Sequence, residues 1–305
     1  MKRGRPALDP DLILSELAKT SSKWLDIKVF AQVESTNDLA ISQLSNNPNE
    51  PVFAITADEQ LKGRGRLQRE WHSPFGAGIA LSVAVPIKLF SCEVSAIPLL
   101  VGIAANNCLK NLGASAKLKW PNDLMIETDS AELKKIGGIL VQRQGDHVVI
   151  GIGLNTDLQV DELPTEAATS LSLLDIHTSR ETLIAALLVE LEKVTKLTSE
   201  DWLPRYIKDS STIGTQVSVA RKSESIVTGI AASVLKSGAL LDWERTRKSE
   251  KVNRETTKPA AITLLSERII FSSRNLSQIP EFLPQLPCQL RLLNLSRFYL
   301  NLANF

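Results

Sequence analysis

The sequence predicts an α/β (α+β) fold, in which a mixed sheet packs with helices and a small β domain follows. Helical and strand-like segments alternate along the first part of the chain, as is typical of an α/β domain. From about residue 213 the pattern changes to short alternating strands separated by turn residues. The 305 residues, 43% of them hydrophobic and 23% charged, are enough for two domains of ordinary composition.

Caps and apolar periodicity predict the elements of the first domain. A helix should begin at the corner Ser35-Thr36-Asn37, because these side chains can cap the apolar run that follows them. The other elements expected in this domain are strand-like segments at 52–57 and 78–85, a long buried helix at 95–112, short strands at 117–120, 136–142 and 147–153, and a helix at 180–197 capped by Ser179.

The small β domain is predicted from three extended segments. These segments are 216–220, 225–234 and 239–243, with a turn at Lys236-Ser237-Gly238 before the last of them. From about Arg245 onward the order is lost, because 245–257 is almost wholly polar and 279–305 has no sustained period. The tail is therefore poorly specified by its sequence.

Composition excludes several classes of protein. The net charge of +1 gives no global attraction to nucleic acid or to acidic membranes. No apolar run approaches the roughly 20 residues that span a bilayer, and the basic N-terminus has no apolar core after it, so we expect a cytoplasmic protein. Cys92, Cys108 and Cys288 lack metal-ligand spacing and are expected to be small buried hydrophobes.

The most informative segment is the loop Gly63–Trp71, which contains Arg64, Arg66 and Arg69. Glycines let a backbone approach a ligand closely, and arginines hold an anion. An isolated basic run is more often a solvated turn. This one joins two strand-like segments of the predicted core, so we expect partners for it elsewhere in the chain.

Four further segments accompany that loop. Each alone has an ordinary structural explanation, but their order is specific. The motifs are Glu34-Ser35-Thr36-Asn37, Gln60, Gly63-Arg64-Gly65-Arg66 with Trp71 and Ser73-Pro74-Phe75-Gly76, Lys119-Trp120-Pro121-Asn122-Asp123-Leu124, and Lys135-Ile136-Gly137-Gly138-Ile139-Leu140 followed by Gly151-Ile152-Gly153-Leu154-Asn155. Together these motifs resemble those of the biotin protein ligases, and the resemblance covers about residues 30–238.

The resemblance implies the reaction and its site. Enzymes of this family activate biotin with ATP and attach it to a lysine of a carrier, usually the biotin carboxyl carrier domain of acetyl-CoA carboxylase. Implied biotin contacts are Ser35, Thr36, Asn37, Gln60, Gly63, Arg64, Gly65, Arg66, Lys135 and Gly138. Implied ATP or adenylate contacts are Arg64, Arg66, Arg69, Trp71, Asn122, Lys135 and Asn155.

The chemistry requires fixed cations, because the carboxylate of biotin and the α-phosphate of ATP repel each other. Lys135 and Arg66 are the expected catalytic cations, and Asp123 is expected to orient or deprotonate the carrier lysine. The alternative role for Asp123 is that of an ordinary turn residue. Lys134 is the alternative to Lys135 as the catalytic lysine, because the two are adjacent in the sequence. Magnesium would bridge phosphates of ATP with few protein ligands, so no dedicated metal cluster is expected.

The expected domains are an N-terminal extension (1–27), a catalytic biotin- and ATP-binding domain of the biotin/lipoate ligase type (28–212), a small SH3-like β domain (213–255) and an atypical tail (256–305). About thirty residues precede the resemblance, too few for the winged helix of bifunctional relatives, so we expect a ligase without specific nucleic-acid binding. The oligomeric state expected is a monomer or a homodimer.

The chain departs from the family in three places. The connection 127–132 is longer than usual, and Lys62 stands where a small residue is more common. No family-like strand follows Trp243, so the tail is either an extension or the product of an altered reading frame.

Two alternatives remain. The first is a lipoate or octanoate ligase or transferase of the same fold, although those enzymes are expected to carry a different loop. The second is a noncatalytic biotin-responsive or DNA-binding protein, for which Arg3-Gly4-Arg5-Pro6 resembles the minor-groove core of an AT-hook.

Overall fold

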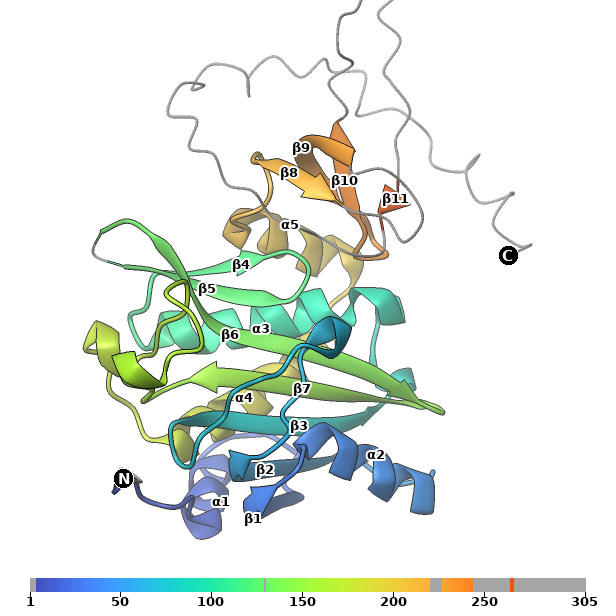
Figure 1. Ribbon diagram of the computed structural model, residues 1–305. Coiled ribbons are helices and arrows are strands. Elements are labelled where there is room, and N and C mark those ends of the chain that lie inside the picture. Colours follow the sequence, from blue (N-terminus) through green and yellow to red (C-terminus); the bar gives the residue numbers. More distant parts are fainter. Residues whose placement is uncertain (1–3, 129, 220–226, 244–263, 266–305) are drawn as a thin grey trace, which may run out of the picture. The chain divides into compact units, whose positions relative to one another are not determined.

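A seven-stranded sheet organises the part of the chain that carries the predicted site (Figure 1). The structure, a computed structural model, describes residues 4–128, 130–219, 227–243 and 264–265. The strands of this sheet are β1 (Ile27–Val33), β2 (Phe53–Gln60), β3 (Gly78–Pro86), β4 (Ala116–Lys119), β5 (Asp123–Glu127), β6 (Leu133–Gln144) and β7 (His147–Asn155). Their order is β1-β2-β3-β7-β6-β5-β4, parallel between β1 and β2 and antiparallel elsewhere.

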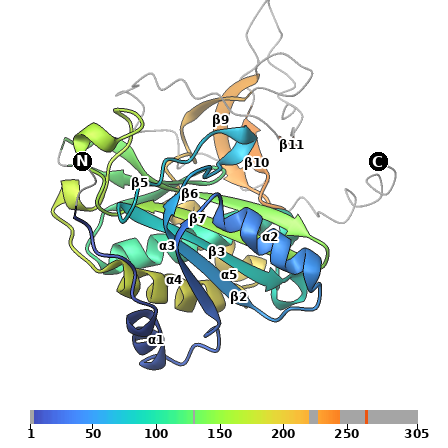
Figure 2. The ribbon, with the colours of Figure 1, turned by 60° about the horizontal axis from the view of Figure 1, so that its bottom comes forward.

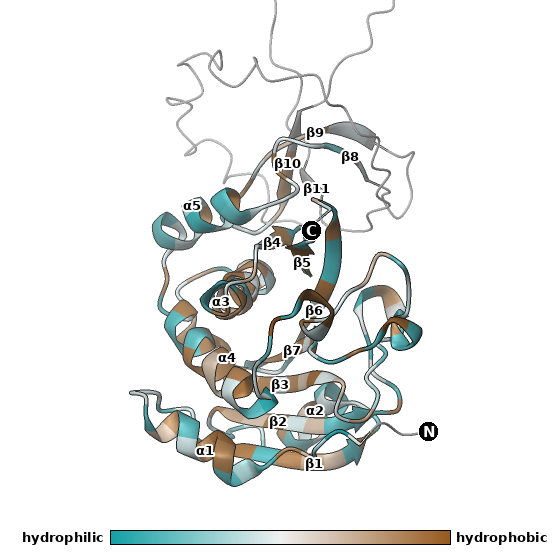
Figure 3. Cartoon of the chain, turned by 90° about the vertical axis from the view of Figure 1, so that its left-hand side faces the viewer, coloured by the Kyte–Doolittle hydropathy of each residue, from teal (hydrophilic) through white to brown (hydrophobic). Residues whose placement is uncertain are grey.

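Helices cover both faces of this sheet (Figures 2 and 3). On one face α2 (Thr36–Asn46) buries Ala40 and Leu44 in an apolar cluster with Phe53 and Ile55. On the other face lie α3 (Ile97–Asn111) and α4 (Arg180–Val194), and α1 (Pro10–Ala18) packs against α4. Neighbouring strand residues point to opposite faces, so the central strands supply apolar side chains to both layers. This arrangement confirms the predicted α/β fold.

Local capping explains where the predicted helices α2 and α4 begin. The Ser35 hydroxyl accepts the Asp38 N–H at 3.3 Å, and the Ser179 hydroxyl accepts the Thr182 N–H at 3.0 Å. These bonds satisfy N–H groups that a first helical turn leaves unpaired. The predicted starts of α2 and α4 are therefore confirmed, and α3 falls within the predicted range 95–112.

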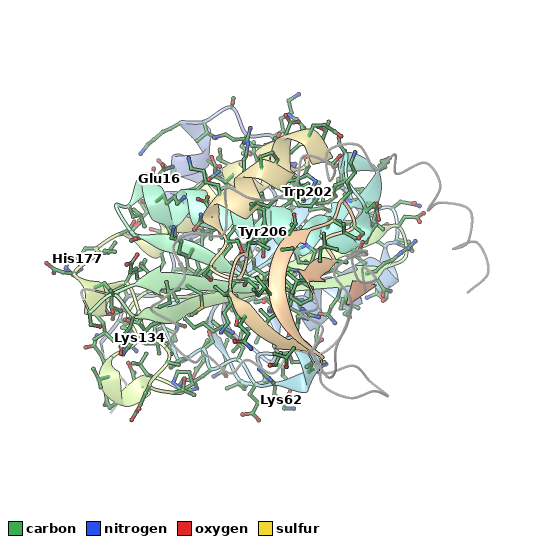
Figure 4. All side chains as sticks on the ribbon, turned by 90° about the horizontal axis from the view of Figure 1, so that it is seen from above. Glu16, Lys62, Lys134, His177, Trp202 and Tyr206 are labelled. Atoms are coloured by element: carbon green, nitrogen blue, oxygen red, sulfur yellow. The ribbon has the colours of Figure 1, made fainter. Side chains whose placement is uncertain are left out.

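Two helices were not predicted, although both have start signals. Asp9 caps α1 just before Pro10, and Thr198 with Asp201 forms a capping box at α5 (Ser199–Asp209). In α5, Trp202 and Tyr206 lie one turn apart and are buried (Figure 4). That burial raises the pKa of the Tyr206 hydroxyl. Both helices are short and each buries only two side chains, so their apolar pattern is too brief to predict a helix.

A second, antiparallel sheet follows α5. Its strands are β8 (Gln216–Val219), β9 (Val227–Val234), β10 (Leu240–Trp243) and β11 (Leu264–Leu265), in the order β11-β10-β9-β8. The predicted strands 216–220, 225–234 and 239–243 are confirmed where the structure describes them, and Gly238 turns between β9 and β10 with φ +79. The short strand β11 was not predicted. The rest of the unusual tail lies outside the described residues.

The prediction of buried cysteines is confirmed for Cys108 and only in part for Cys92. Cys108 is buried in α3 and Cys92 is half-buried, and both are free thiols. Burial raises the pKa of Cys108 to about 12 and that of Cys92 to about 11. Cys288 lies outside the described residues. Among the helices that are described, none has the length and apolarity needed to cross a membrane.

Candidate active site

An ion pair between β5 and β6 forms the centre of the site. The Nζ of Lys135 lies 2.6 Å from Oδ1 of Asp123, and both side chains remain partly exposed, at 36% and 27%. Asp123 pairs with Gly138 across the two strands, and a register shift after Leu124 places Met125 opposite Lys135. The antiparallel pairing thus joins two predicted catalytic residues that are twelve positions apart. The contact to Asp123 comes from Lys135 and not from its neighbour Lys134.

The backbone of Lys135 is held by a second segment of the chain. Its N–H donates to the Ala167 carbonyl at 2.7 Å, and its own carbonyl accepts the Thr169 N–H at 2.9 Å. The Thr169 carbonyl in turn accepts the amide of Asn155 at 2.9 Å. Asn155, the predicted adenine contact, is buried here and fixes Thr169. The segment 167–169, which the sequence analysis did not single out, therefore sets the position of Lys135.

The Trp71 indole packs against two glycines of the sheet. A Cβ at Gly153 would lie 2.3 Å from the indole, and a Cβ at Gly138 would lie 3.4 Å from it. The Lys135 ammonium lies 5.7 Å from the centroid of the ring, within the range of a cation–π contact. Glycine is thus required at 153 by close approach of a side chain, and the loop is packed directly beside Lys135.

Backbone hydrogen bonds within the arginine loop join its two arms. The Trp71 N–H donates to the Gly63 carbonyl, and the Gly65 N–H donates to the Arg69 carbonyl. At its tip, Arg66–Gln68 forms a 3-10 turn in which Leu67 has φ 59. Arg64 pairs with Asp38 of α2 at 2.8 Å. The loop is therefore ordered by its own backbone bonds and by one exposed ion pair.

Arg66 lines a cavity of about 660 Å³. Other parts of its wall come from Trp120–Asn122, from Ile139–Gln142 and from the turn Ser237–Ala239. The Trp120 indole donates to the Gly238 carbonyl at 2.9 Å, so a turn of the second sheet is bonded to the wall. The cavity combines aliphatic surface with guanidinium groups, which suits a ligand with an apolar part and an anionic part. Arg69 is exposed on the loop.

A buried polar cluster surrounds the start of α2. Gln60 Oε1 accepts from the Thr36 N–H at 2.9 Å and from the Thr36 hydroxyl at 3.0 Å. The Ser82 hydroxyl lies 2.7 Å from Thr36 Oγ1 and 2.6 Å from Asn37 Oδ1, and the Asn37 amide donates to Gln142 at 2.7 Å. The structure thus unites predicted residues with Ser82, which the sequence analysis missed. The signal was a single hydroxyl within the apolar run 78–85.

Two polar residues of the Lys-Trp-Pro-Asn-Asp motif complete the surroundings. The Asn122 amide donates to the Ile139 carbonyl at 2.9 Å and so ties this motif to β6. Lys119 of β4 lies opposite Asp123 of β5 in the antiparallel strand pairing. Burial lowers the pKa of Lys119, Asp123 raises it and Lys135 lowers it further. Lys119 was not among the predicted site residues, yet it belongs to one electrostatic cluster with Asp123 and Lys135.

The donor set fits substrate anions better than a resident metal. In the part of the chain that the structure describes, no group of three or more His, Cys, Asp or Glu side chains is placed to hold a metal ion. The Lys135 ammonium pairs with the Asp123 carboxylate, and the charge of Lys119 interacts with both. Such a site can neutralise a carboxylate beside a phosphate.

Comparison with known proteins agrees with this geometry. The sequence model of the Biotin/lipoate A/B protein ligase family matches residues 29–155, which include every predicted site residue. The chain is 30% identical over 248 residues to the biotin–[acetyl-CoA-carboxylase] ligase of Mycobacterium tuberculosis, an alignment that covers 78% of this chain and 91% of that protein. It is 30% identical over 226 residues to the bifunctional ligase/repressor BirA of Escherichia coli, covering 70% and 68%.

A solved structure shows the same fold. The biotin protein ligase of Aquifex aeolicus, in complex with biotin and ATP, superposes with a TM-score of 0.61 at 23% identity, covering 72% of this chain and 92% of that one. The alignment with the Mycobacterium tuberculosis protein covers most of both chains at 30% identity. The chain therefore belongs to the biotin protein ligases of the biotin/lipoate A/B protein ligase family.

Proposed function

We propose that this ligase joins biotin to ATP as biotinyl-5'-AMP and then transfers biotin to a lysine of the biotin carboxyl carrier domain of acetyl-CoA carboxylase. The Lys135–Asp123 ion pair beside the arginine loop carries this proposal. The name of the Mycobacterium tuberculosis relative supports the choice of acceptor. The division into domains, the magnesium requirement, the cytoplasmic location and a monomeric or homodimeric state remain predictions.

In the first half-reaction, a carboxylate oxygen of biotin attacks the α-phosphorus of ATP. The bond from that phosphorus to the bridging oxygen breaks, and pyrophosphate leaves. The Lys135 ammonium, partly exposed at the centre of the site, can neutralise the carboxylate and the phosphate oxygens together. Arg64 and Arg66 add positive charge from the loop, and closure of the loop excludes water from the mixed anhydride.

In the second half-reaction, the carrier lysine attacks the acyl carbon and AMP leaves. Before ligands arrive, the Asp123 carboxylate is engaged by Lys135. An anionic adenylate competes for that ammonium, so binding of the adenylate releases Asp123 to bind the carrier lysine and accept its proton. The ion pair thereby links the order of the two steps: Asp123 becomes a base only after the adenylate has formed.

A pair of neighbouring lysines tests the proposal. The purified chain is incubated with biotin, magnesium ATP and an apo carrier domain, and the labelled carrier is detected with streptavidin. We expect Lys135→Met to lower the labelling rate by about 10²- to 10³-fold, the usual effect of removing one charge-stabilising donor, and Lys134→Met to leave it nearly unchanged.

Two results would contradict these assignments. Normal labelling by Lys135→Met would remove Lys135 from the chemistry. Absence of biotin labelling by the wild-type chain, together with attachment of lipoate in a parallel reaction, would replace the function by the lipoate alternative.

A further inference from the structure

Arg5 lies in the segment before the first strand of the catalytic fold, yet its side chain is almost fully buried, at 7% exposure. Its Nε donates to Asp157 at 2.8 Å, and its two terminal nitrogens reach the two oxygens of Glu162 at 3.0 and 2.5 Å. One of these nitrogens also donates to the Asp157 carbonyl at 2.6 Å. Bidentate pairing of this kind fixes geometry as well as charge.

The contacts of Arg5 exclude a DNA-binding role for this side chain. The sequence Arg3-Gly4-Arg5-Pro6 suggested a DNA-contacting arm, but a guanidinium enclosed by two carboxylates cannot also enter a groove. The hydrogen bonds that Arg5 donates to Glu162 raise the pKa of Arg5 in spite of its burial. Gly76, with φ +67, lies so close that a Cβ there would come within 2.6 Å of the Arg5 Cβ. Arg5 is therefore part of the packed interior.

The backbone around Arg5 is anchored independently. The Pro6 carbonyl accepts from the guanidinium of Arg180 at 2.6 Å, and Arg180 forms a buried ion pair with Asp58 at 2.7 Å. The Asp58 carboxylate also accepts the Leu8 N–H at 3.0 Å. The N-terminal segment is thus fastened to β2 and to the start of α4. These contacts fix the position of the backbone next to Arg5.

The partners of Arg5 belong to the segment that leads to Lys135. Glu162 ends a 3-10 turn and also accepts the Gln159 N–H at 3.0 Å. The Ser170 hydroxyl donates to the Leu158 carbonyl at 2.7 Å and so joins the two ends of this segment. Between them lie Ala167 and Thr169, whose backbones bracket Lys135. A continuous chain of bonds therefore runs from Arg5 to the catalytic lysine.

We propose that Arg5 is a positioning residue, an N-terminal latch that holds 157–162 so that 167–169 keeps Lys135 aligned with its substrates. The kinetic consequence rests on the proposed function, while the ordering of 157–170 does not. A displacement of about 1 Å at a catalytic group can cost about 10² in rate, so a loose bracket has a measurable effect.

The experiment compares Arg5→Met with Lys19→Met in the full chain. Methionine keeps the apolar stem of each side chain and removes the charge, and Lys19 is an exposed lysine directly after α1, paired only with Glu16 among the contacts that are described. Hydrogen exchange is measured on peptides covering 157–170 and on peptides of α3. For Arg5→Met we expect exchange to rise about tenfold in 157–170 but not in α3, and for Lys19→Met no change in either.

Steady-state kinetics give a second readout. We expect Arg5→Met to lower kcat about tenfold with little change in the KM for biotin, and Arg5→Lys to restore part of kcat. If Arg5→Met does not fold, Glu162→Gln replaces it, since that variant removes one arm of the latch and keeps the arginine.

Unchanged exchange in 157–170, or a rise that is equal in α3, would overturn the latch. A wild-type chain that fails to label a carrier would count against the proposed function alone, because the exchange measurement needs no turnover.

Discussion

Asp123 has a structural role in a cluster of charged side chains and a proposed chemical role in the transfer step. Its carboxylate meets the Lys135 ammonium at 2.6 Å and also raises the pKa of Lys119, so it stabilises two cations in a partly buried cluster. Without it, two ammonium groups would face each other and repel. In the proposed mechanism, the same carboxylate is the base of the transfer step. Its structural and chemical roles can be separated by measuring the two half-reactions one at a time.

We predict that Asp123→Asn slows transfer to the carrier by about 10²- to 10⁴-fold, the range for loss of a general base, and slows adenylate formation much less. Single-turnover measurements of pyrophosphate release and of carrier labelling give the two rates. The Lys135→Met variant is the contrasting control, because it should impair both steps. An equal loss in both steps for Asp123→Asn would show that the residue acts only by holding Lys135.

The position of the arginine loop depends on how the loop packs against the sheet. The loop carries the cations, but its position depends on the Trp71 indole lying on β6 and β7. Position 153 must be glycine, because a methyl group there would overlap the ring, whereas a Cβ at 138 would make an ordinary contact with it. The adjacent polar cluster depends in the same way on Ser82 of β3, which is fully buried between Thr36 and Asn37. Small residues of the sheet therefore determine where the loop and the polar cluster lie.

We predict that Gly153→Ala lowers the labelling rate at least tenfold, because the added methyl group displaces Trp71 and with it the loop. Trp71→Ala in the same background removes the overlap, so the double variant should be no slower than Trp71→Ala alone. Gly4→Ala is a matched control, since a Cβ at Gly4 meets nothing within 4 Å. Additive losses in the double-mutant cycle would contradict the proposed overlap.

The molecule as a whole buries several groups that ionise only at alkaline pH. Burial raises the pKa of Cys108 to about 12, that of Cys92 to about 11 and that of Tyr206 as well. These groups are neutral in the folded chain at a pH where the unfolded chain has already released their protons. Because the unfolded state then binds fewer protons, the free energy of unfolding falls as pH rises above the unfolded value of about 9 for a cysteine.

We predict that Cys108→Ala flattens this decline between pH 9 and 11. A single group contributes at most about 1.4 kcal/mol per pH unit, and Cys108, at 2% exposure, should approach that limit over the upper part of the range. Urea unfolding of the wild type and the variant at several pH values measures the two slopes. Other ionising groups are common to both proteins, so identical slopes would contradict a neutral buried thiol.

Local features of the chain proved reliable guides to structure. Ser35 and Ser179 mark helix starts because a cap depends on residues only three positions apart. Most strands were predicted from short apolar or alternating segments, which are also local, but β1, β5 and β11 were not predicted. The short helices α1 and α5 escaped notice, since a capping signal without a long apolar stripe resembles an ordinary turn.

Sequence alone determined the family, the α/β fold and the residues to consider, because order and spacing of motifs are properties of the chain itself. Tertiary structure decided which of those residues meet. It paired Asp123 with Lys135, gave Asn155 the task of holding Thr169, and buried Arg5 between Asp157 and Glu162. These contacts join positions from twelve to more than 150 residues apart, and burial that depends on distant segments leaves no period or local motif in the sequence.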